Sequence, residues 1–279
     1  MNHELAQDRK LASFRNPESN RLLAALPDTE LQRWLPKLEP VELPLGKVIH
    51  EAGVTPTHVY FPTTAIVSLL HMTQSGASAD VALVGKEGLV GISLFMGGGF
   101  SNSSAVVLKA GHGFRLRADH MIVEFGQAGS VMRLLLRYTQ ALITQMAQTA
   151  VCNRHHSLDQ QLSRWLLLNL DRVKGDDLAM TQELISNNLG VRRESVTEAA
   201  MKLQRAGVIS YARGHITVLD RSELENLACE CYATVKKEYD RLLPAAPVHS
   251  TARQTRYSPV TARYGLKLAT QTRTLHCQT

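Results

Sequence analysis

Cysteine, aromatic residues and long apolar runs are all scarce in this chain of 279 residues. The cysteines stand too far apart for the dense disulfide framework of a small secreted protein; they are Cys152, Cys229, Cys231 and Cys277. No apolar run is long enough to span a bilayer, and the charged N-terminus lacks the apolar core of a secretion signal. These absences predict a cytoplasmic protein with no membrane segment.

Acidic residues are absent from the last part of the chain. Residues 245–279 hold five basic residues and no acid, so they account for all but one of the six net positive charges. Net charge therefore says little about the rest of the chain. The segment also lacks apolar periodicity, as disordered segments do. We expect a disordered basic tail at 245–279 and a flexible arm at 1–18.

The stretch Thr181–Ile209 predicts two helices joined by a tight turn. Apolar residues recur at helical spacing on both sides of Gly190, which permits the backbone of a sharp turn. Apolar and polar residues then alternate around Arg213 and Gly214, which is a β-hairpin signal. A plain helical hairpin is the alternative, and this signal disfavours it. Helix, turn, helix and hairpin are typical of a winged helix, whose second helix enters the DNA major groove.

This stretch resembles the DNA-binding domain of the Crp/Fnr family of bacterial transcription regulators. The resemblance is carried by Thr181-Gln182-Glu183-Leu184-Ile185, Leu189-Gly190, Arg193-Glu194-Ser195-Val196 and the run from Leu203 to Ile209. It extends more weakly back to about Asn20. It implies a homodimer that binds double-stranded DNA at a roughly palindromic operator, with RNA polymerase as a partner. The expected DNA contacts are Thr181, Gln182, Arg192, Arg193, Glu194, Ser195, Thr197, Glu198 and Lys202.

From Val41 to Arg117, short apolar runs are punctuated by glycine and proline. Many short strands between turns favour an antiparallel barrel or jelly roll, which the resemblance equates with the family's sensor barrel. We therefore expect an α+β protein with an N-terminal antiparallel β jelly-roll barrel, a long dimerisation helix and a C-terminal winged helix-turn-helix. The expected bounds are 19–128 for the barrel, 129–156 for the dimerisation helix and hinge, 157–221 for the winged helix and 222–244 for a C-terminal helix.

One long apolar helix is expected from about Ser130 to Asn153, and it carries two apolar stripes. A heptad-like stripe consists of Val131, Leu135, Tyr138, Leu142, Gln145 and Thr149. A neighbouring stripe consists of Leu136, Ile143, Met146 and Ala150. One stripe can pack on the barrel and the other on a partner helix, although periodicity alone leaves a buried core helix open. Because the resemblance implies a parallel dimer helix, we assign the heptad-like stripe to the dimer interface.

His155 and His156 interrupt the helical pattern and predict a hinge between the two halves of the chain. Together with Cys152 they could in principle ligate a metal ion. However, adjacent histidines do not easily share one ion, and the spacing Cys229-x-Cys231 is unusual for a zinc knuckle. We therefore expect solvated hinge histidines, idle thiols, and no metal or other cofactor.

A cyclic nucleotide would find neither of the charged residues that hold it in the resembled family. There a glutamate binds the ribose and an arginine pairs with the phosphate, whereas here Ile92 and either Asn102 or Ser103 stand at the matching positions. No arginine occurs between Arg33 and Arg115. A buried phosphate needs a charged, bidentate donor, so we argue against cyclic AMP and cyclic GMP. The expected degenerate effector pocket is Gly91, Ile92, Ser93, Asn102, Ser103 and Ser104.

Other ligands and activities have less support, and an unknown small-molecule effector is preferred to none. An iron–sulfur sensor is disfavoured because no cysteine precedes Cys152. Haem stays open because several histidines lie in or near the barrel, although lone histidines are usually surface or hydrogen-bonded residues; these are His50, His58, His71, His112 and His120. The barrel has no His-x-His or His-x-Asp pair, and the chain has no Gly-x-Ser-x-Gly elbow, so we expect no enzyme. The remaining alternative is a degenerate barrel that acts as a ligand-binding or scaffold protein without operator binding.

Glu198 departs from the best-known members of the resembled family, which carry an arginine at this position. A carboxylate cannot donate to guanine, but it can accept from cytosine N4. Glu198 would then read a different base pair. Alternatively, it pairs with Lys202 at i,i+4 on the same helix. The sequence leaves both interpretations open.

Overall fold

The computed structural model describes residues 16–74 and 78–243. The predicted basic tail at 245–279 and most of the predicted arm at 1–18 lie outside these residues. At the end of that arm the chain forms a short 3-10 helix, η1 (Pro17–Ser19). None of the described helices is long and apolar enough to cross a membrane.

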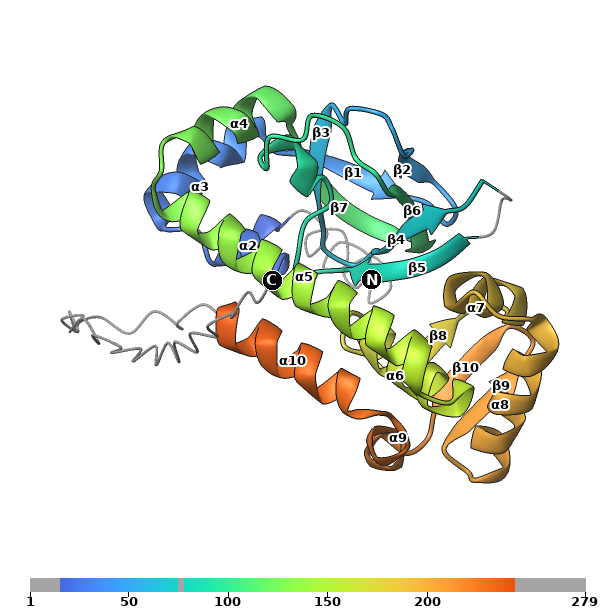
Figure 1. Cartoon of the computed structure of the whole chain (residues 1–279). Coiled ribbons are helices and arrows are strands. Elements are labelled where there is room, and N and C mark those ends of the chain that lie inside the picture. The colour runs from blue at the N-terminus through green and yellow to red at the C-terminus, as the bar shows by residue number, and fades with distance from the viewer. Residues whose placement is uncertain (1–15, 75–77, 244–279) are drawn as a thin grey trace, which may run out of the picture. The chain divides into compact units, whose positions relative to one another are not determined.

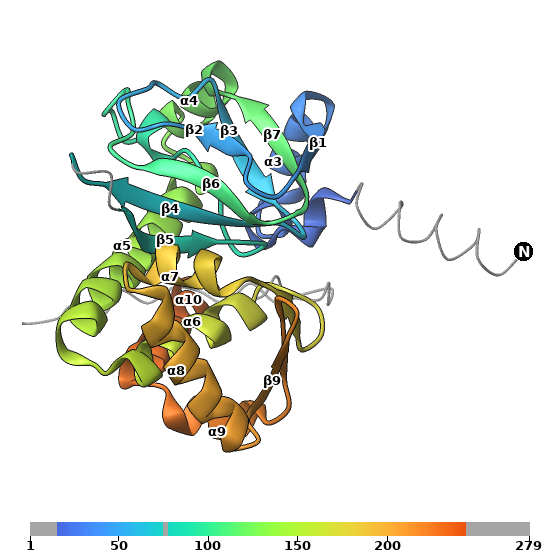
Figure 2. The same ribbon diagram turned by 90° about the vertical axis from the view of Figure 1, so that its right-hand side faces the viewer.

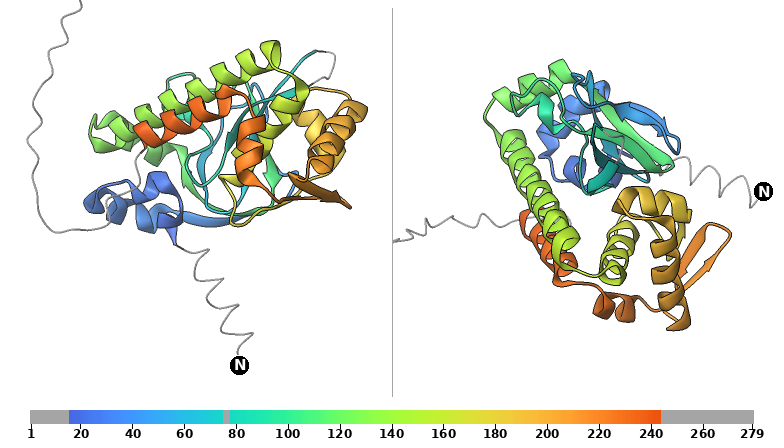
Figure 3. Two further views of the ribbon diagram at one scale, coloured as in Figure 1. Left: turned by 90° about the horizontal axis from the view of Figure 1, so that it is seen from below. Right: turned by 45° about the vertical axis from the view of Figure 1, so that its right-hand side comes forward.

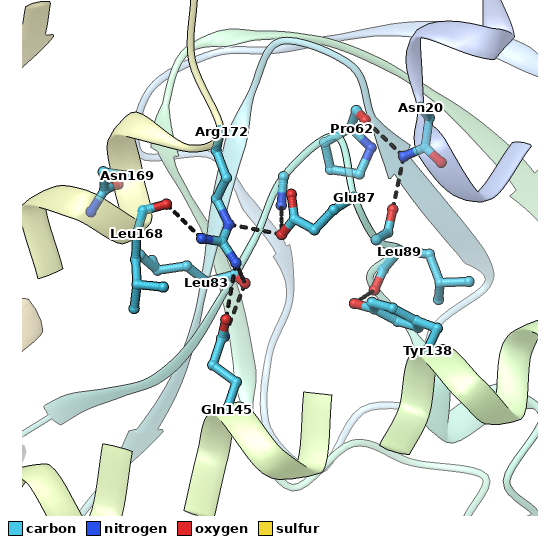
Figure 4. Close-up of polar contacts among 12 residues, drawn as sticks. Asn20, Pro62, Leu83, Glu87, Leu89, Tyr138, Gln145, Leu168, Asn169 and Arg172 are labelled. Carbon is cyan, nitrogen blue, oxygen red and sulfur yellow. Dashed lines mark hydrogen bonds and ion pairs between the residues drawn. The ribbon is translucent and has the colours of Figure 1, made fainter. Parts of the chain in front are cut away.

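Asn20 caps the first α-helix and joins it to the barrel. Its Oδ1 accepts the N–H groups of Leu22 and Leu23, which would otherwise have no partner in the first turn. Its Nδ2 donates to the carbonyls of Pro62 and Gly88, both at 2.8 Å (Figure 4). The helices here are α2 (Arg21–Ala24), α3 (Asp28–Trp34) and the 3-10 helix η2 (Leu35–Lys37).

Two antiparallel sheets form the N-terminal barrel (Figure 1). One sheet has the order β1-β7-β3 and the other β2-β6-β4-β5. Their strands are β1 (Glu39–Leu43), β2 (Val48–His50), β3 (His58–Pro62), β4 (Ile66–Met72), β5 (Ser78–Val84), β6 (Ser104–Lys109) and β7 (Gly111–Arg117). A further 3-10 helix, η3 (Ile92–Leu94), lies between β5 and β6. Alternate residues of the strands enclose one apolar core, as half-buried antiparallel strands do.

A short and a long helix follow the barrel. They are α4 (Ala118–Gly126) and α5 (Ser130–His155). The long helix matches the predicted element, whereas α4 is absent from the sequence-based prediction. Helix α5 lays one apolar face on the barrel, and the C-terminal helix α10 (Glu230–Leu242) runs beside it (Figures 1 and 3).

The C-terminal half begins with α6 (Leu158–Leu170), whose first turn is closed by a capping box between Ser157 and Gln160. Figure 2 shows the remaining helices and the hairpin of this half below the barrel. Its small sheet has the order β8-β10-β9. The elements are β8 (Asp177–Ala179), α7 (Gln182–Leu189), α8 (Arg193–Arg205), β9 (Ile209–Ala212) and β10 (His215–Val218). The predicted α+β class, with barrel, long helix and winged helix-turn-helix, is confirmed.

The C-terminal segment forms two helices, and the prediction of a single helix here is wrong. Helix α9 (Arg221–Leu227) ends at Ala228, whose backbone is extended, and α10 begins at Glu230. The apolar spacing continues across the break, so periodicity gave no sign of it. The break turns the side chains of Cys229 and Cys231 inward, where both are buried.

Candidate nucleic-acid interface and its links to the barrel

The turn between α7 and α8 is built by residues with specific backbone roles. Thr181 caps α7, since its hydroxyl accepts the N–H of Leu184 at 3.2 Å. Gly190 ends the helix at φ 66°, in the left-handed region that favours glycine. The chain then turns sharply into α8, so the predicted helix-turn-helix is present.

Helix α8 buries one face and exposes its N-terminal end. The buried face consists of Val196, Ala199, Ala200 and Leu203. Six of the predicted DNA contacts are exposed, and they are Thr181, Arg192, Arg193, Glu194, Glu198 and Lys202. The other three, Gln182, Ser195 and Thr197, are half-buried. The fold thus places Arg192, Arg193, Glu194 and Ser195 at the N-terminal end of α8, whereas Thr181 and Gln182 lie at the start of α7 and Lys202 lies in the last turn of α8.

Besides the capping hydroxyl of Thr181, three of these predicted side chains have contacts within the chain. The hydroxyl of Thr197 lies 3.0 Å from Gln182 Oε1 and ties α8 to α7. Lys202 Nζ lies 2.8 Å from Asp159 Oδ2 in α6. Lys202 therefore pairs with Asp159, whereas an i,i+4 pair with Glu198 was one of the two alternatives. Within the described part of the chain, the Glu198 carboxylate has no hydrogen-bond or ion-pair partner and faces solvent.

The wing is a tight hairpin with an arginine at its tip. Arg213 and Gly214 both have positive φ, at 51° and 78°, as a two-residue hairpin turn with the twist of its strands requires. Arginine rarely adopts this conformation, and strain of this kind concentrates at functional sites. The guanidinium of Arg213 is exposed, so a phosphate contact can be added to the predicted list.

A buried ion pair links the end of α6 to the barrel (Figure 4). Arg172 Nε donates to Glu87 Oε1 at 2.7 Å, and these side chains are 4% and 9% exposed. Arg172 Nη2 also donates to the Leu83 carbonyl of β5 and to Gln145 Oε1 of α5, at 3.1 and 2.9 Å. A single guanidinium therefore joins the barrel, the long helix and the C-terminal half.

Asp80 provides a second buried link. Its carboxylate accepts from Ser68 Oγ at 3.0 Å and lies 3.4 Å from Trp165 Nε1 of α6. Burial raises the pKa of Asp80 from 3.8 to about 7, against the lowering effect of both hydrogen bonds. The group therefore titrates in the physiological range at a contact between β5 and α6.

Asp80→Asn should flatten the pH dependence of stability. Because the folded state raises the pKa of Asp80, it binds the proton more tightly than the unfolded state does. The stability that this proton contributes is therefore complete below pH 3.8 and is lost as the pH rises toward about 7. At about pH 8 the variant should be more stable than the parent by a few kcal/mol, at roughly 1.4 kcal/mol per pKa unit. Urea unfolding across this pH range measures the difference, with exposed Asp176→Asn as control. If the stability of the parent and of Asp80→Asn changed with pH in the same way, the raised pKa of Asp80 would be contradicted.

The heptad-like stripe of α5 packs inside the chain, which corrects its assignment to the dimer interface. Leu135 is 2% exposed and Leu142 0%, so neither has surface left to bury against a partner. Val131, Tyr138 and Gln145 are buried as well, and Thr149 is half-buried beside Arg164. Of the neighbouring stripe, Leu136, Ile143 and Ala150 face outward, with Leu136 45% and Ile143 48% exposed, whereas Met146 is half-buried against the core. Burial within the chain therefore shows which of the two stripes is free to meet a partner.

The six residues of the predicted effector pocket lie in a turn and a loop of the barrel, and none of the six side chains is charged. Gly91 has φ 107° and precedes η3, and the hydroxyl of Ser93 is buried there. The Ser104 hydroxyl accepts the N–H of Ala52 at 3.1 Å, and Asn102 is exposed. Ile92 and Ser103 are half-buried.

The structure also assembles a cluster that the sequence analysis set aside. The ligand atoms of Cys152, His156, Cys229 and Cys231 all lie within 4.8 Å of one another. Burial raises the pKa of Cys152 to about 12 and that of Cys231 to about 11, and the Arg164 guanidinium opposes both shifts. His155 is exposed as expected, but the His156 side chain is only 13% exposed, so the prediction of two solvated hinge histidines is wrong for His156.

Comparison with known proteins assigns the fold. A family model of the Crp-like helix-turn-helix domain matches residues 160–227. No curated protein matches the chain in sequence. FixK2 from Bradyrhizobium japonicum is similar in structure, with a TM-score of 0.58 and 18% identity over 69% of this chain and 98% of that chain. So is TTHB099, a CRP-family transcriptional regulator from Thermus thermophilus, with a TM-score of 0.56 and 18% identity over 67% of this chain and 96% of that chain.

A third such structure is TTHA1359 from the same organism, a CRP/FNR-family transcriptional regulator, with a TM-score of 0.52 and 20% identity over 68% of this chain and 98% of that chain. A winged helix-turn-helix behind a β barrel and a long helix defines a class of DNA-binding regulators. Residues 160–227 are a Crp-like helix-turn-helix domain, and the chain has the fold of the Crp/Fnr transcription regulators. The resemblance inferred from Thr181–Ile209 is confirmed.

Proposed function

We propose that the chain is a homodimeric transcription regulator of the Crp/Fnr type that binds specific DNA sequences. The observation that carries this proposal is the exposed N-terminal end of α8. Among the described residues, no hydrogen bond or ion pair holds the side chains of Arg192, Arg193 and Glu198 away from a groove. The alternative, a scaffold without operator binding, gives no reason for this exposed polar end or for the arginine at the wing tip. RNA polymerase is the partner through which such a regulator would act.

The proposed DNA complex places two α8 helices in successive major grooves, about 34 Å apart. Arg193 would pair with guanine O6 and N7, and Glu198 would accept from cytosine at the neighbouring base pair. Arg213 of the wing would contact phosphate. Thr197 would act mainly through Gln182, by holding α7 against α8.

Selection of bound DNA from a random pool tests this function directly. The full chain is incubated with the pool, with and without cell extract to supply an effector, and the retained fragments are sequenced. A roughly palindromic logo supports the proposal. Retention without any sequence preference under both conditions would favour the scaffold interpretation.

Arg193→Ala should lose the preference for one base pair in each half-site. A bidentate arginine–guanine contact contributes about 1–3 kcal/mol of discrimination. Arg205→Ala is the matched control, because Arg205 is exposed at the opposite end of α8. It should weaken binding to all sequences alike. Titrations by fluorescence anisotropy on the selected site and on a scrambled site measure both effects. If Arg193→Ala kept the sequence specificity of the parent, Arg193 would not contact a base.

The proposed effector is a small molecule other than a cyclic nucleotide. Among the strands β1 to β7 and their connections, arginines occur only at the end of β7, and both are already paired: Arg115 lies 2.7 Å from Glu39 and Arg117 lies 3.0 Å from Asp119. The pocket positions Ile92 and Ser103 bring no charge for a cyclic phosphate. A phosphate buried there would lack the charged donor that such a site needs.

Titration calorimetry with cyclic AMP should therefore show no saturable heat at micromolar concentrations of the nucleotide. The same experiment with cyclic GMP should give the same result. Saturable micromolar binding of either nucleotide would show that another group neutralises the phosphate and would overturn this part of the proposal.

The proposed dimer uses the outward stripe of α5. It consists of the exposed residues of the neighbouring stripe together with Gln140 and Ala147, and it leaves out the half-buried Met146. Its residues recur at alternating spacings of four and three, which is the repeat of a coiled-coil seam; they are Leu136, Gln140, Ile143, Ala147 and Ala150. Small residues at its C-terminal end would let two helices approach closely near the hinge. We therefore transfer the dimer assignment from the buried stripe to this one.

A further inference from the structure

Four metal-ligating side chains meet where α5 ends and α10 begins. Cys152 and His156 stand one helical turn apart on α5 and its C-cap, so they lie on the same face. Cys229 and Cys231 flank the first residue of α10, after the break that separates it from α9. The cluster thus joins two elements that are far apart in the sequence.

The distances fit a single tetrahedral ion. Cys152 Sγ lies 3.5 Å from Cys229 Sγ, and Cys231 Sγ lies 3.6 Å from His156 Nδ1. Bonds of about 2.3 Å to sulfur and about 2.0–2.1 Å to nitrogen place tetrahedral ligands roughly 3.5–3.8 Å apart. With all the ligand atoms within 4.8 Å, the space they enclose suits one ion.

We propose that Cys152, His156, Cys229 and Cys231 bind one Zn²⁺ ion in a closed, structural site. Three sulfur ligands and one imidazole form a set that zinc prefers, and a full set of protein ligands leaves no open position for catalysis. The three cysteines are 0–4% exposed, which shields the site from solvent.

The surroundings of the cluster match those of a metal site. His156 Nε2 lies 3.3 Å from Glu230 Oε1, so the ring can donate to the carboxylate while Nδ1 points toward Cys231. A carboxylate on the second nitrogen commonly orients a metal-ligating histidine. Three thiolates, a neutral imidazole and Zn²⁺ would carry one net negative charge, and the buried guanidinium of Arg164 acts on Cys152 and Cys231 from nearby.

A disulfide and plain packing of thiols are the alternatives to a metal site, and each predicts different chemistry. A Cys152–Cys229 disulfide would need the sulfur atoms to close from 3.5 Å to about 2.05 Å, and it would leave Cys231 and His156 facing each other without a common role. Simple core packing of thiols needs neither the histidine nor its carboxylate partner. The zinc site accounts for all the residues together, and it would fasten α10 to the end of α5 at the hinge.

The test measures metal in the full-length chain purified under reducing conditions without a histidine tag. We expect inductively coupled plasma mass spectrometry to find one zinc ion per chain. Chelation followed by Co²⁺ should give the visible bands of tetrahedral cobalt and thiolate charge transfer in the near ultraviolet. His156→Gln and Cys229→Ser should lower zinc affinity at least about tenfold. His155→Gln and Cys277→Ser are the matched controls and should keep full occupancy.

Several results would overturn the site. These are a chain that neither contains zinc nor binds added Co²⁺, full occupancy in His156→Gln and Cys229→Ser, or a Cys152–Cys229 disulfide found by thiol alkylation of protein kept free of oxygen. Co²⁺ titration of the parent protein needs no variant, so a variant that fails to fold leaves the result decisive. Metal content is measured without DNA, so this outcome is independent of the proposed function.

Discussion

Arg172→Met is expected to lower the free energy of unfolding by about 3–5 kcal/mol, because it leaves the buried Glu87 carboxylate without its ion-pair partner and with only the N–H of Gly85 as a donor. The same change removes donors from the Leu83 carbonyl and from Gln145 Oε1. Methionine keeps most of the volume of the side-chain stem, so the effect reports mainly on charge and hydrogen bonding. Urea unfolding followed by the fluorescence of Trp34 and Trp165 provides the measurement.

The control is an exposed ion pair of the same chemistry. Arg115 pairs with Glu39 at 2.7 Å, but these side chains are 38% and 49% exposed. Solvent screens such a pair, so Arg115→Met should cost less than about 1 kcal/mol. Adding Glu87→Gln to Arg172→Met should recover part of the loss, because it removes the orphaned charge. Equal costs for Arg172→Met and Arg115→Met would show that the buried network contributes little.

A signal that passed between the barrel and the C-terminal half would have to rearrange the contacts of this ion pair. Arg172 directly follows α6, Gln145 belongs to α5, and Glu87 and Leu83 belong to the barrel (Figure 4). A ligand that moved the chain around Glu87 would therefore act on α5 and α6 together. Asp80 and Trp165 add a parallel contact between β5 and α6. Coupling of this kind would require two discrete arrangements of a shared element, and these contacts lie where β5, α5 and α6 meet.

The helix-turn-helix could be predicted from the sequence because its signals are local. Thr181 caps α7, Gly190 turns the chain, and the burial of α8 follows its helical spacing. The hairpin turn at Arg213 and Gly214 could be predicted equally well, since a two-residue loop constrains the backbone of both residues. Each of these features depends on a few neighbouring residues, so no knowledge of the tertiary structure was needed.

Strands β1 and β7 have weak local strand signals because tertiary contacts determine their residues. Pro40 interrupts the alternation of β1, and Gly111 and Gly113 weaken the strand signal of β7. These glycines are needed for close packing: a Cβ at Gly113 would lie 2.6 Å from the Phe61 carbonyl oxygen of the neighbouring strand. A residue that weakens a strand locally is therefore required by the sheet.

The burial of α5 and the meeting of the cysteines could not be predicted from local patterns for a related reason. Both stripes of α5 are apolar at coiled-coil spacing, and only burial against the barrel shows that Leu135 and Leu142 belong to the core. Cys152 and Cys229 are 77 residues apart in the sequence. Their meeting depends on α10 folding back along α5, which no local pattern reveals. A histidine one turn after Cys152 and a Cys-x-Cys pair were the available signals.

Replacing Leu136 and Ile143 together with aspartate should convert the proposed dimer into a monomer. The residues are 45% and 48% exposed in the single chain, so the change leaves the chain's own core intact. In a dimer seam it would bury unpaired charges on both helices, which is strongly unfavourable. Light scattering should report the mass of one chain, and far-ultraviolet circular dichroism should be unchanged. Replacing Ile122 and Val123 with aspartate is the control, because both are at least as exposed but lie on α4.

DNA binding should fall with the dimer, since a monomer engages only one half-site. Joining two half-site contacts in one molecule raises avidity by about 10²–10⁴-fold, so the variant should lose roughly that much affinity for a palindromic site. On an isolated half-site it should bind as the parent does, because α8 and the wing are untouched. Leu135→Ala should act differently: it removes core packing and lowers stability by about 2–5 kcal/mol. If the double aspartate variant had the mass of a dimer, the interface would lie elsewhere on the chain. If the variant were a monomer that still bound the palindrome tightly, operator recognition would not depend on dimerisation.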